Sequence, residues 1–173
     1  MKAELFSSDF MISMFVFLAA FLVITVYYEN LQSDVYENSN RNDMMSKAIK
    51  VASLLAESSG YPQFWNSTDV QVIGLYDSGK FNLTKLEYLI NNTTSYPATY
   101  QTVKTMLGTG VYNFFISLKN TTDDIIQKPD TNYNYSYGMP IINSEQTVLV
   151  KRLGVVNLEG NSTKVTLEVV LWV

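Results

Sequence analysis

The 173-residue chain contains no cysteine and no histidine. Without cysteine it forms no disulfide bonds and has no thiol nucleophile, and without histidine it lacks the most common general base and a usual zinc ligand. The remaining residues form no recognisable set of nucleophile, base and orienting group, so we expect no enzyme activity, no metal and no cofactor. The net charge of −4 argues against a nucleic-acid partner, because phosphate binding needs a basic face.

Charge is also absent from a 19-residue segment, Phe10 to Tyr28, which contains no proline or glycine. As an α-helix this segment spans roughly 28 Å, close to the roughly 30 Å hydrocarbon core of a bilayer. It is longer than the apolar region of a secretory signal peptide, and no Ala-x-Ala cleavage pattern follows it. We therefore expect a short N-terminal segment, residues 1–9, and a retained transmembrane or filament-core helix, residues 10–28.

Residues 29–59 are expected to continue this helix in amphipathic form. They contain no proline or glycine, and apolar residues recur every three or four positions from Met45 to Leu55. Gly60, with a proline two residues later, predicts the end of the helix. Between the two parts, the polar patch at residues 37–43 consists of weak helix formers and predicts a bend, a local unwinding or simple solvent exposure.

Residues 60–173 are expected to form an extracellular head domain of the α+β class, with an antiparallel sheet against which the end of the long helix packs. Short helices are predicted after a cap at Asn82 and over Ala98–Leu107, with an irregular loop from Asn120 to Asn143. Strands are predicted from β-forming residues and alternation at Val70–Tyr76, Val111–Leu118, Thr147–Leu158 and Thr163–Val173. The last two are joined by a short turn-like linker at residues 159–162 and so suggest a hairpin.

Asn-x-Ser/Thr glycosylation motifs occur only beyond residue 60. Lys2 and the terminal amine precede the apolar segment, whereas the first cation after it is Arg41. This small bias in cations favours an N-terminus inside the cell, which would place these motifs outside. Such motifs matter only in exported chains and require surface exposure. The candidate acceptors are Asn66, Asn82, Asn91, Asn92, Asn120, Asn134 and Asn161.

Tyr133, Tyr135 and Tyr137 alternate within a polar stretch and are the best candidates for surface recognition. Tyrosine offers a large contact area and a hydroxyl group at a low entropic cost. The alternative is that these side chains pack on the head's own sheet or at a contact between subunits, since clustered aromatic residues most often mark protein interfaces.

The order of these segments resembles the type IV pilin superfamily, and within it the archaeal pilin-like proteins. The resemblance covers the whole architecture, and its specific motif is Lys2-Ala3-Glu4, followed by Ser8-Asp9-Phe10 and the apolar run. It implies that a membrane peptidase cuts after Ala3 on the cytoplasmic side, so that the mature protein begins at Glu4. At the fifth mature position, where the bacterial form has Glu, this chain has Ser8, followed by Asp9.

The resemblance also implies that many copies bury their apolar helices against one another in a filament core while the heads cover the outside. The residues expected to take part in assembly are Asp9, Phe10, Phe15, Phe17 and Phe21. Asp9 has two candidate roles. It pairs with the N-terminal amine of a neighbouring subunit, or it lies in the headgroup region beside Lys2.

We therefore expect a major or minor structural subunit of an extracellular type IV pilus-like filament, with adhesion as a further role. Its expected partners are itself or related pilins, the membrane before assembly, and N-linked glycans. The expected location is the cell envelope, with the head outside, and then the filament. The alternative is a monomeric signal-anchored envelope protein whose head binds a ligand or another protein.

Overall fold

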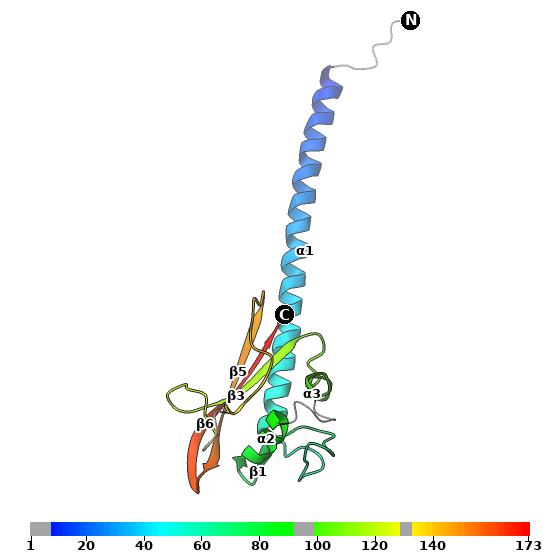
Figure 1. Ribbon diagram of the computed structural model, residues 1–173. Coiled ribbons are helices and arrows are strands. Elements are labelled where there is room, and N and C mark those ends of the chain that lie inside the picture. The colour runs from blue at the N-terminus through cyan, green and yellow to red at the C-terminus, as the bar shows by residue number, and fades with distance from the viewer. Residues whose placement is uncertain (1–7, 92–98, 129–132) are drawn as a thin grey trace, which may run out of the picture. The chain divides into compact units, whose positions relative to one another are not determined.

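The computed structural model describes residues 8–91, 99–128 and 133–173 (Figure 1). The chain divides into two units, Met1–Asn40 and Arg41–Val173, and helix α1 (Ser8–Glu57) contributes to both. The helix is continuous through the polar patch at residues 37–43, all of which are exposed to solvent. Of the three alternatives for that patch, solvent exposure is therefore the one observed.

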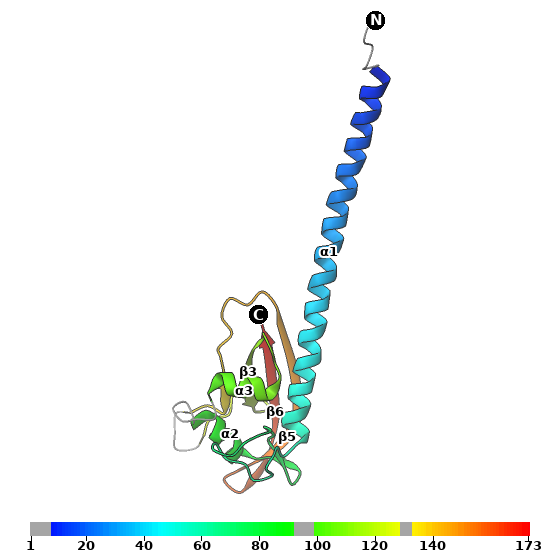
Figure 2. The same cartoon turned by 90° about the vertical axis from the view of Figure 1, so that its right-hand side faces the viewer.

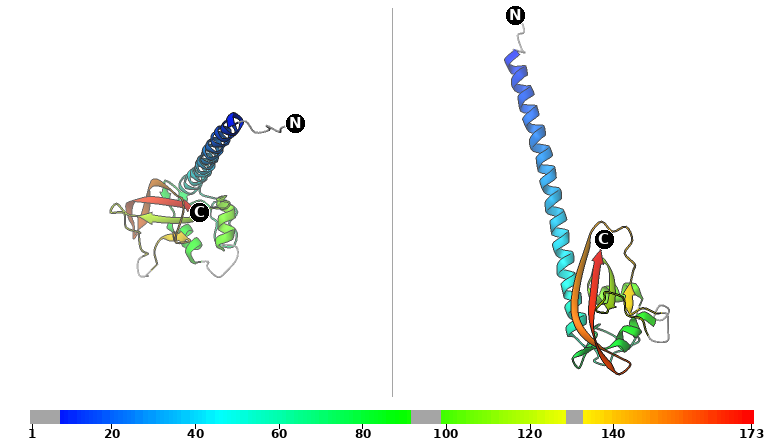
Figure 3. Two further views of the ribbon diagram at one scale, coloured as in Figure 1. Left: turned by 90° about the horizontal axis from the view of Figure 1, so that it is seen from above. Right: turned by 90° about the vertical axis from the view of Figure 1, so that its left-hand side faces the viewer.

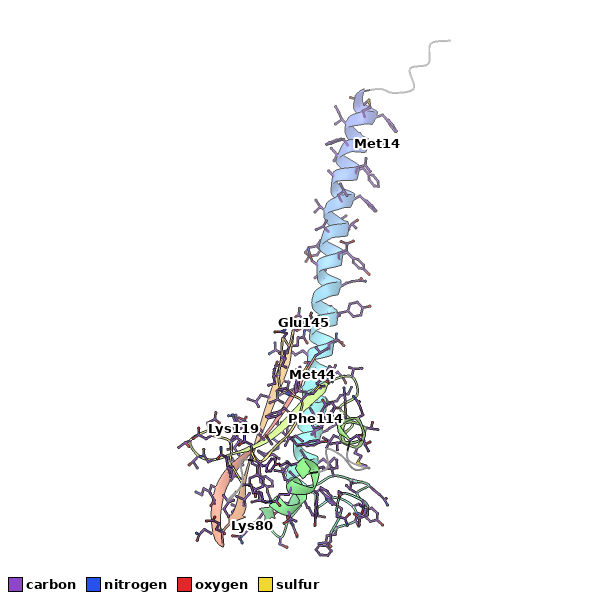
Figure 4. All side chains as sticks on the ribbon, in the orientation of Figure 1. Met14, Met44, Lys80, Phe114, Lys119 and Glu145 are labelled. Atoms are coloured by element: carbon purple, nitrogen blue, oxygen red, sulfur yellow. The ribbon has the colours of Figure 1, made fainter. Side chains whose placement is uncertain are left out.

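The first unit consists, in its described part, of the N-terminal stretch of α1. From Asp9 to Asn40 every described side chain is exposed except that of Thr25, which is half-buried. The hydroxyl of Thr25 donates a 2.9 Å hydrogen bond to the carbonyl oxygen of Phe21, so the polar group is satisfied within the helix. Figure 4 shows the side chains around Met14 projecting outward from the helix.

The second unit is an α+β head whose core includes the last turns of α1. Met44, Ala48, Val51, Ala52 and Leu55 are fully buried, and their spacing places them on one face of the helix. They share one hydrophobic core with the inward-facing residues of the sheet. The amphipathic pattern predicted the burial of Ala48, Ala52 and Leu55, but it was wrong for Met45 and Ile49, which are 43% and 40% exposed.

The sheet of the head has six strands in the order β1-β2-β5-β6-β3-β4. The expected α+β head is confirmed. Most strand pairs are antiparallel, and the one parallel pair is β2 with β5, through the pairing of Phe81 with Val156. A Cβ atom on Gly154 would collide with the Phe81 ring, which shows how closely that ring packs on β5. The strands are β1 (Tyr76–Asp77), β2 (Lys80–Phe81), β3 (Asn113–Lys119), β4 (Ser136–Gly138), β5 (Thr147–Leu158) and β6 (Asn161–Trp172).

The expected C-terminal hairpin is confirmed. Figure 3 shows its turn and the chain's C-terminus at opposite ends of the hairpin. The turn is tighter than expected, because only Glu159 and Gly160 separate the strands, and both have positive φ values of 49° and 87°. Two positive φ values match a type I′ turn, whose twist suits a two-residue hairpin. Of the alternating residues predicted for one face of the last strand, Val173 is 54% exposed and the other four are buried: Val165, Leu167, Val169 and Leu171.

Two short helices complete the head. Helix α2 (Leu83–Asn91) begins after the predicted cap, since Asn82 Oδ1 accepts a 3.0 Å hydrogen bond from the Thr84 amide. Helix α3 (Tyr100–Leu107) begins after Thr99 and ends at Gly108, whose φ of 68° is the left-handed cap conformation. In Figure 2, α3 lies beside β3, and the ring of Tyr100 stacks on Phe114 of β3 at 4.9 Å.

Two further expectations needed correction. Of the predicted strand Val70–Tyr76, only Tyr76 belongs to a strand, β1. Val72 forms a single bridge to Tyr61, and the segment instead inserts Val70, Ile73 and Leu75 into the core. The predicted loop at residues 120–143 contains strand β4, which pairs with β3. In both cases the packing around the segment, rather than its own residue preferences, decides the conformation.

Candidate functional site

The first candidate site is the apolar stretch of α1 in the first unit. Among the described residues it is the one helix long and apolar enough to cross a membrane, and no part of its most apolar window is buried. Its aromatic side chains are more than half exposed: Phe10 54%, Phe15 77%, Phe17 67% and Phe21 58%. Such a surface requires lipid or other protein around it, because water solvates it poorly.

Asp9 lies in the first turn of α1, where the helix dipole favours a negative charge. Its position at the edge of the apolar stretch agrees with either of the two roles expected for it. The expected processing residues Lys2, Ala3 and Glu4 lie outside the described residues.

The alternating tyrosines do not form one surface. Tyr133 is 62% exposed, whereas Tyr135 is buried and its hydroxyl donates a 3.0 Å hydrogen bond to Glu87 Oε1. Burial, followed by the bond to Glu87, raises the pKa of Tyr135 to about 12. A surface role is therefore wrong for Tyr135, which anchors its segment to α2 through this hydrogen bond.

Tyr137 is half-buried and packs against Phe114 with 6.0 Å between the ring centroids. Burial raises the pKa of its hydroxyl to about 12, so this group stays neutral at physiological pH. Tyr137 therefore belongs partly to the core and partly to the adjoining surface, as the alternative interpretation of this cluster expected.

A pocket of about 490 Å³ opens between α3 and β4. No charged side chain occurs among its described lining residues, and five of them carry hydroxyl groups, which suits a neutral partner. Sequence reasoning missed Tyr100 here, although its position at the start of a predicted amphipathic helix was a usable signal. The described lining residues are Ile90, Thr99, Tyr100, Phe115, Tyr133, Ser136, Tyr137 and Gly138.

The expected glycan acceptors fall in different environments. Asn66 and Asn120 lie in turns, Asn82 caps α2, Asn134 precedes the buried Tyr135, and Asn161 begins β6. The Asn91 side chain and the whole of Asn92 lie outside the described residues. The surroundings thus separate motifs that are equivalent by sequence.

A cluster of charges lies where β3, β5 and β6 meet. The carboxylate of Glu168 is 6% exposed, with Lys119 Nζ at 2.8 Å and Lys151 Nζ at 2.7 Å. Asp123 pairs with the same two lysines at 3.5 and 3.2 Å. The bond to Glu168 is the main cause that raises the pKa of both lysines, and the bond to Lys151 is the main cause that lowers the pKa of Asp123. The two lysines balance the two carboxylates, so removing one partner would leave a charge in the sheet without compensation. The described residues contain no group of side chains that could hold a metal ion.

Comparisons with known family models, curated proteins and solved structures found no match for this chain.

Proposed function

We propose that the chain is a structural subunit of an extracellular type IV pilus-like filament, held in the membrane by α1 before assembly. The single observation that carries the proposal is the exposed apolar stretch of α1, which continues as one helix into the core of the head. The resemblance at Lys2-Ala3-Glu4 and Ser8-Asp9-Phe10 supports the same assignment.

Energetics support a partner for this stretch. Burying one phenylalanine side chain contributes about 1.5–3 kcal/mol, so the four exposed phenylalanines of this stretch contribute about 6–12 kcal/mol when covered. That gain is comparable with the whole folding free energy of a domain. A chain extracted from lipid therefore gains most by packing this helix against copies of itself.

The apolar residues also surround the helix rather than forming one stripe. Exposed side chains at Phe15, Phe17 and Leu18 point in three directions around the axis, because consecutive residues differ by about 100°. A helix that is apolar on all sides suits lipid or the interior of a helix bundle. Both surroundings occur in turn if the subunit moves from the membrane into a filament.

The alternative function is a monomeric envelope protein that uses the same helix as a permanent anchor. The observation that favours it is the length of the apolar window, which is sufficient for one membrane crossing. In either case the exposed Tyr133 and the neighbouring pocket are the part of the head best suited to contact a surface.

The deciding experiment starts from cells that make the protein. Cells are sheared, the released fibres are collected, and the N-terminal peptide of the chain is determined by mass spectrometry. The filament proposal expects the chain in the fibres with Glu4 as its first residue. A chain that keeps Met1 and stays with the membranes would instead establish the anchor.

The chain has no cysteine, so a single cysteine introduced by substitution is the one thiol available for cross-linking between copies. Phe17→Cys is expected to give covalent dimers with a short bismaleimide in the fibre fraction, since neighbouring helices bury this position. Thr121→Cys is the matched control, because this exposed residue lies in a surface turn of the head. Equal dimer yields at the two positions would contradict a core built from α1.

A further inference from the structure

The sequence offers seven Asn-x-Ser/Thr motifs, six with threonine in the third position and one, at Asn134, with serine, but the head does not present them equally. We infer that the folded head carries N-linked glycans at Asn66 and Asn120, while Asn82 and Asn134 stay unmodified. The inference rests on the proposed function in one respect, since it requires that the head be exported. Beyond the proposed function, the inference specifies which asparagines of the folded head are accessible to a glycosyl transferase.

Asn66 is half-buried in a turn whose hydrogen bonds use Oδ1 of its side chain and not Nδ2. Its Oδ1 accepts hydrogen bonds from both the backbone amide and the hydroxyl of Thr68, at 2.8 and 2.6 Å. The Asp69 carboxylate accepts a 2.7 Å bond from the Asn66 backbone amide and closes the turn. Among the described residues, Nδ2 of Asn66 has no hydrogen-bond partner, so the group that would bind the sugar is unused.

Asn120 repeats this arrangement in an unrelated part of the head, directly after β3. Its Oδ1 accepts from the backbone amide and the hydroxyl of Thr122, at 2.9 and 2.8 Å, and from the Asp124 amide at 2.9 Å. Asn120 is half-buried and its neighbours Thr122 and Asp123 are exposed, and Nδ2 of Asn120 has no partner in the described part of the chain. Both turns therefore hold the asparagine by its oxygen and leave its nitrogen free.

The reaction needs that nitrogen. Nδ2 forms a bond to the anomeric carbon of a sugar carried on a phosphate or diphosphate, and the bond from that carbon to the phosphate oxygen breaks. The electron pair leaves with the phosphate, and one Nδ2 proton passes to a base of the transferase. Nothing is oxidised or reduced, and the activated sugar is the only co-reactant.

Both polar groups of the Asn82 side chain already form hydrogen bonds within the head. Its Oδ1 accepts from the backbone amides of Thr84 and Lys85 at the start of α2, and its Nδ2 donates to Asp77 at 3.4 Å. A transferase could take this side chain only by uncapping the helix. Modification at Asn82 therefore competes with the fold, whereas modification at Asn66 does not.

Asn134 is excluded for a different reason. The middle residue of its motif, Tyr135, is 3% exposed and is tied by its hydroxyl to Glu87. Asn134 itself is exposed, but its motif is fixed to the head through Tyr135, and a transferase could bend this segment into an active site only by pulling Tyr135 out of the core. The Asn161 side chain is exposed, but its backbone pairs with Leu158 in the hairpin. We therefore make no assignment for this site and do not use it as a control.

The test is a site-by-site glycopeptide map of the full chain purified from the surface of its own cells. Trypsin isolates Asn82 on the short peptide between Lys80 and Lys85, and places Asn66 on the peptide that ends at Lys80. Additional cleavage at Asp130 separates Asn120 from Asn134. The expected map has glycan at Asn66 and Asn120 and only unmodified peptide at Asn82 and Asn134.

Glycan at Asn82 and Asn134 to the same extent as at Asn66 would overturn the inference, because it would mean that the chain is modified before it folds. If surface biotinylation labels the head in intact cells and Asn66 and Asn120 are nevertheless unmodified, the inference is overturned. Export of the head would still be supported by the labelling. A head that is not labelled would reject the proposed function together with this inference. Thr68→Ala and Thr122→Ala supply matched controls, each removing the glycan at one site only.

Discussion

Replacing Glu168 with glutamine tests the charge cluster of the sheet. The change keeps the size of the side chain and removes the negative charge between Lys119 and Lys151. Lys119 has a side chain only 19% exposed, so water cannot fully replace the lost partner. Removing one member of a fully buried ion pair costs about 3–5 kcal/mol, and the remaining Asp123 reduces this, so we expect a loss of about 1–2 kcal/mol.

The measurement is urea unfolding of the full chain in detergent. Trp172, on the same strand as Glu168 and buried, reports the unfolding of the sheet by its fluorescence. At a slope of about 2 kcal/mol/M, the expected loss lowers the urea midpoint by about 0.5–1 M. Glu145→Gln is the control, because this exposed carboxylate is expected to change stability by less than about 0.5 kcal/mol. A Glu168 variant as stable as this control would refute the reasoning.

The same cluster of charges determines how the free energy of unfolding changes with pH. The bond to Glu168 raises the pKa of Lys119 above its ordinary value of 10.5. Stabilisation from this lysine is therefore complete below pH 10.5 and is lost as the pH rises through the raised pKa. Unfolding measured from neutral to strongly alkaline pH should show a steeper decline in the wild type than in Glu168→Gln. Parallel declines would show that the two groups are not coupled.

Three further changes probe the core, the loop packing and the apolar helix. Leu55→Ala should lower the unfolding free energy by about 2–5 kcal/mol in the same urea assay, since it leaves a cavity between α1 and the sheet. Gly74→Ala should destabilise by about 1–3 kcal/mol, because the new Cβ would collide with the Ser58 carbonyl oxygen and the Gly60 amide; a neutral result would contradict that close packing. Leu22→Lys should weaken membrane insertion by about 2.5–3.5 kcal/mol, seen as release of the chain into carbonate extracts, and unchanged retention would argue against a membrane stage.

Much of this fold follows from local patterns. The absence of proline and glycine between Phe10 and Ser59 predicts one long helix, and the structure has it, ending at Glu57. Strong alternation in Thr163–Val173 predicts the final strand and its buried face. The caps at Asn82 and Gly108 are also visible in the sequence, because a helix end depends on a few neighbouring residues.

The candidate sites divide in the same way. The apolar stretch of α1 can be recognised from composition alone, since length and lack of charge define it. The tyrosine cluster cannot be sorted that way: identical spacing places Tyr133 in solvent and Tyr135 in the core. Glycosylation motifs of the same pattern likewise differ in structure, because Asn82 is hydrogen-bonded as a helix cap and the motif of Asn134 contains the buried Tyr135.

By itself the sequence determined the elements whose causes are local: the helix α1, its apolar and amphipathic parts, the helix caps and the terminal hairpin. Tertiary structure decided what depends on residues far apart in the chain. It set the parallel pairing of Phe81 with Val156, the burial of Glu168 between Lys119 and Lys151, and the bond from Tyr135 to Glu87. The physical reason is that burial and partner choice are settled only when the sheet closes over the helix, and no short stretch of sequence contains that information.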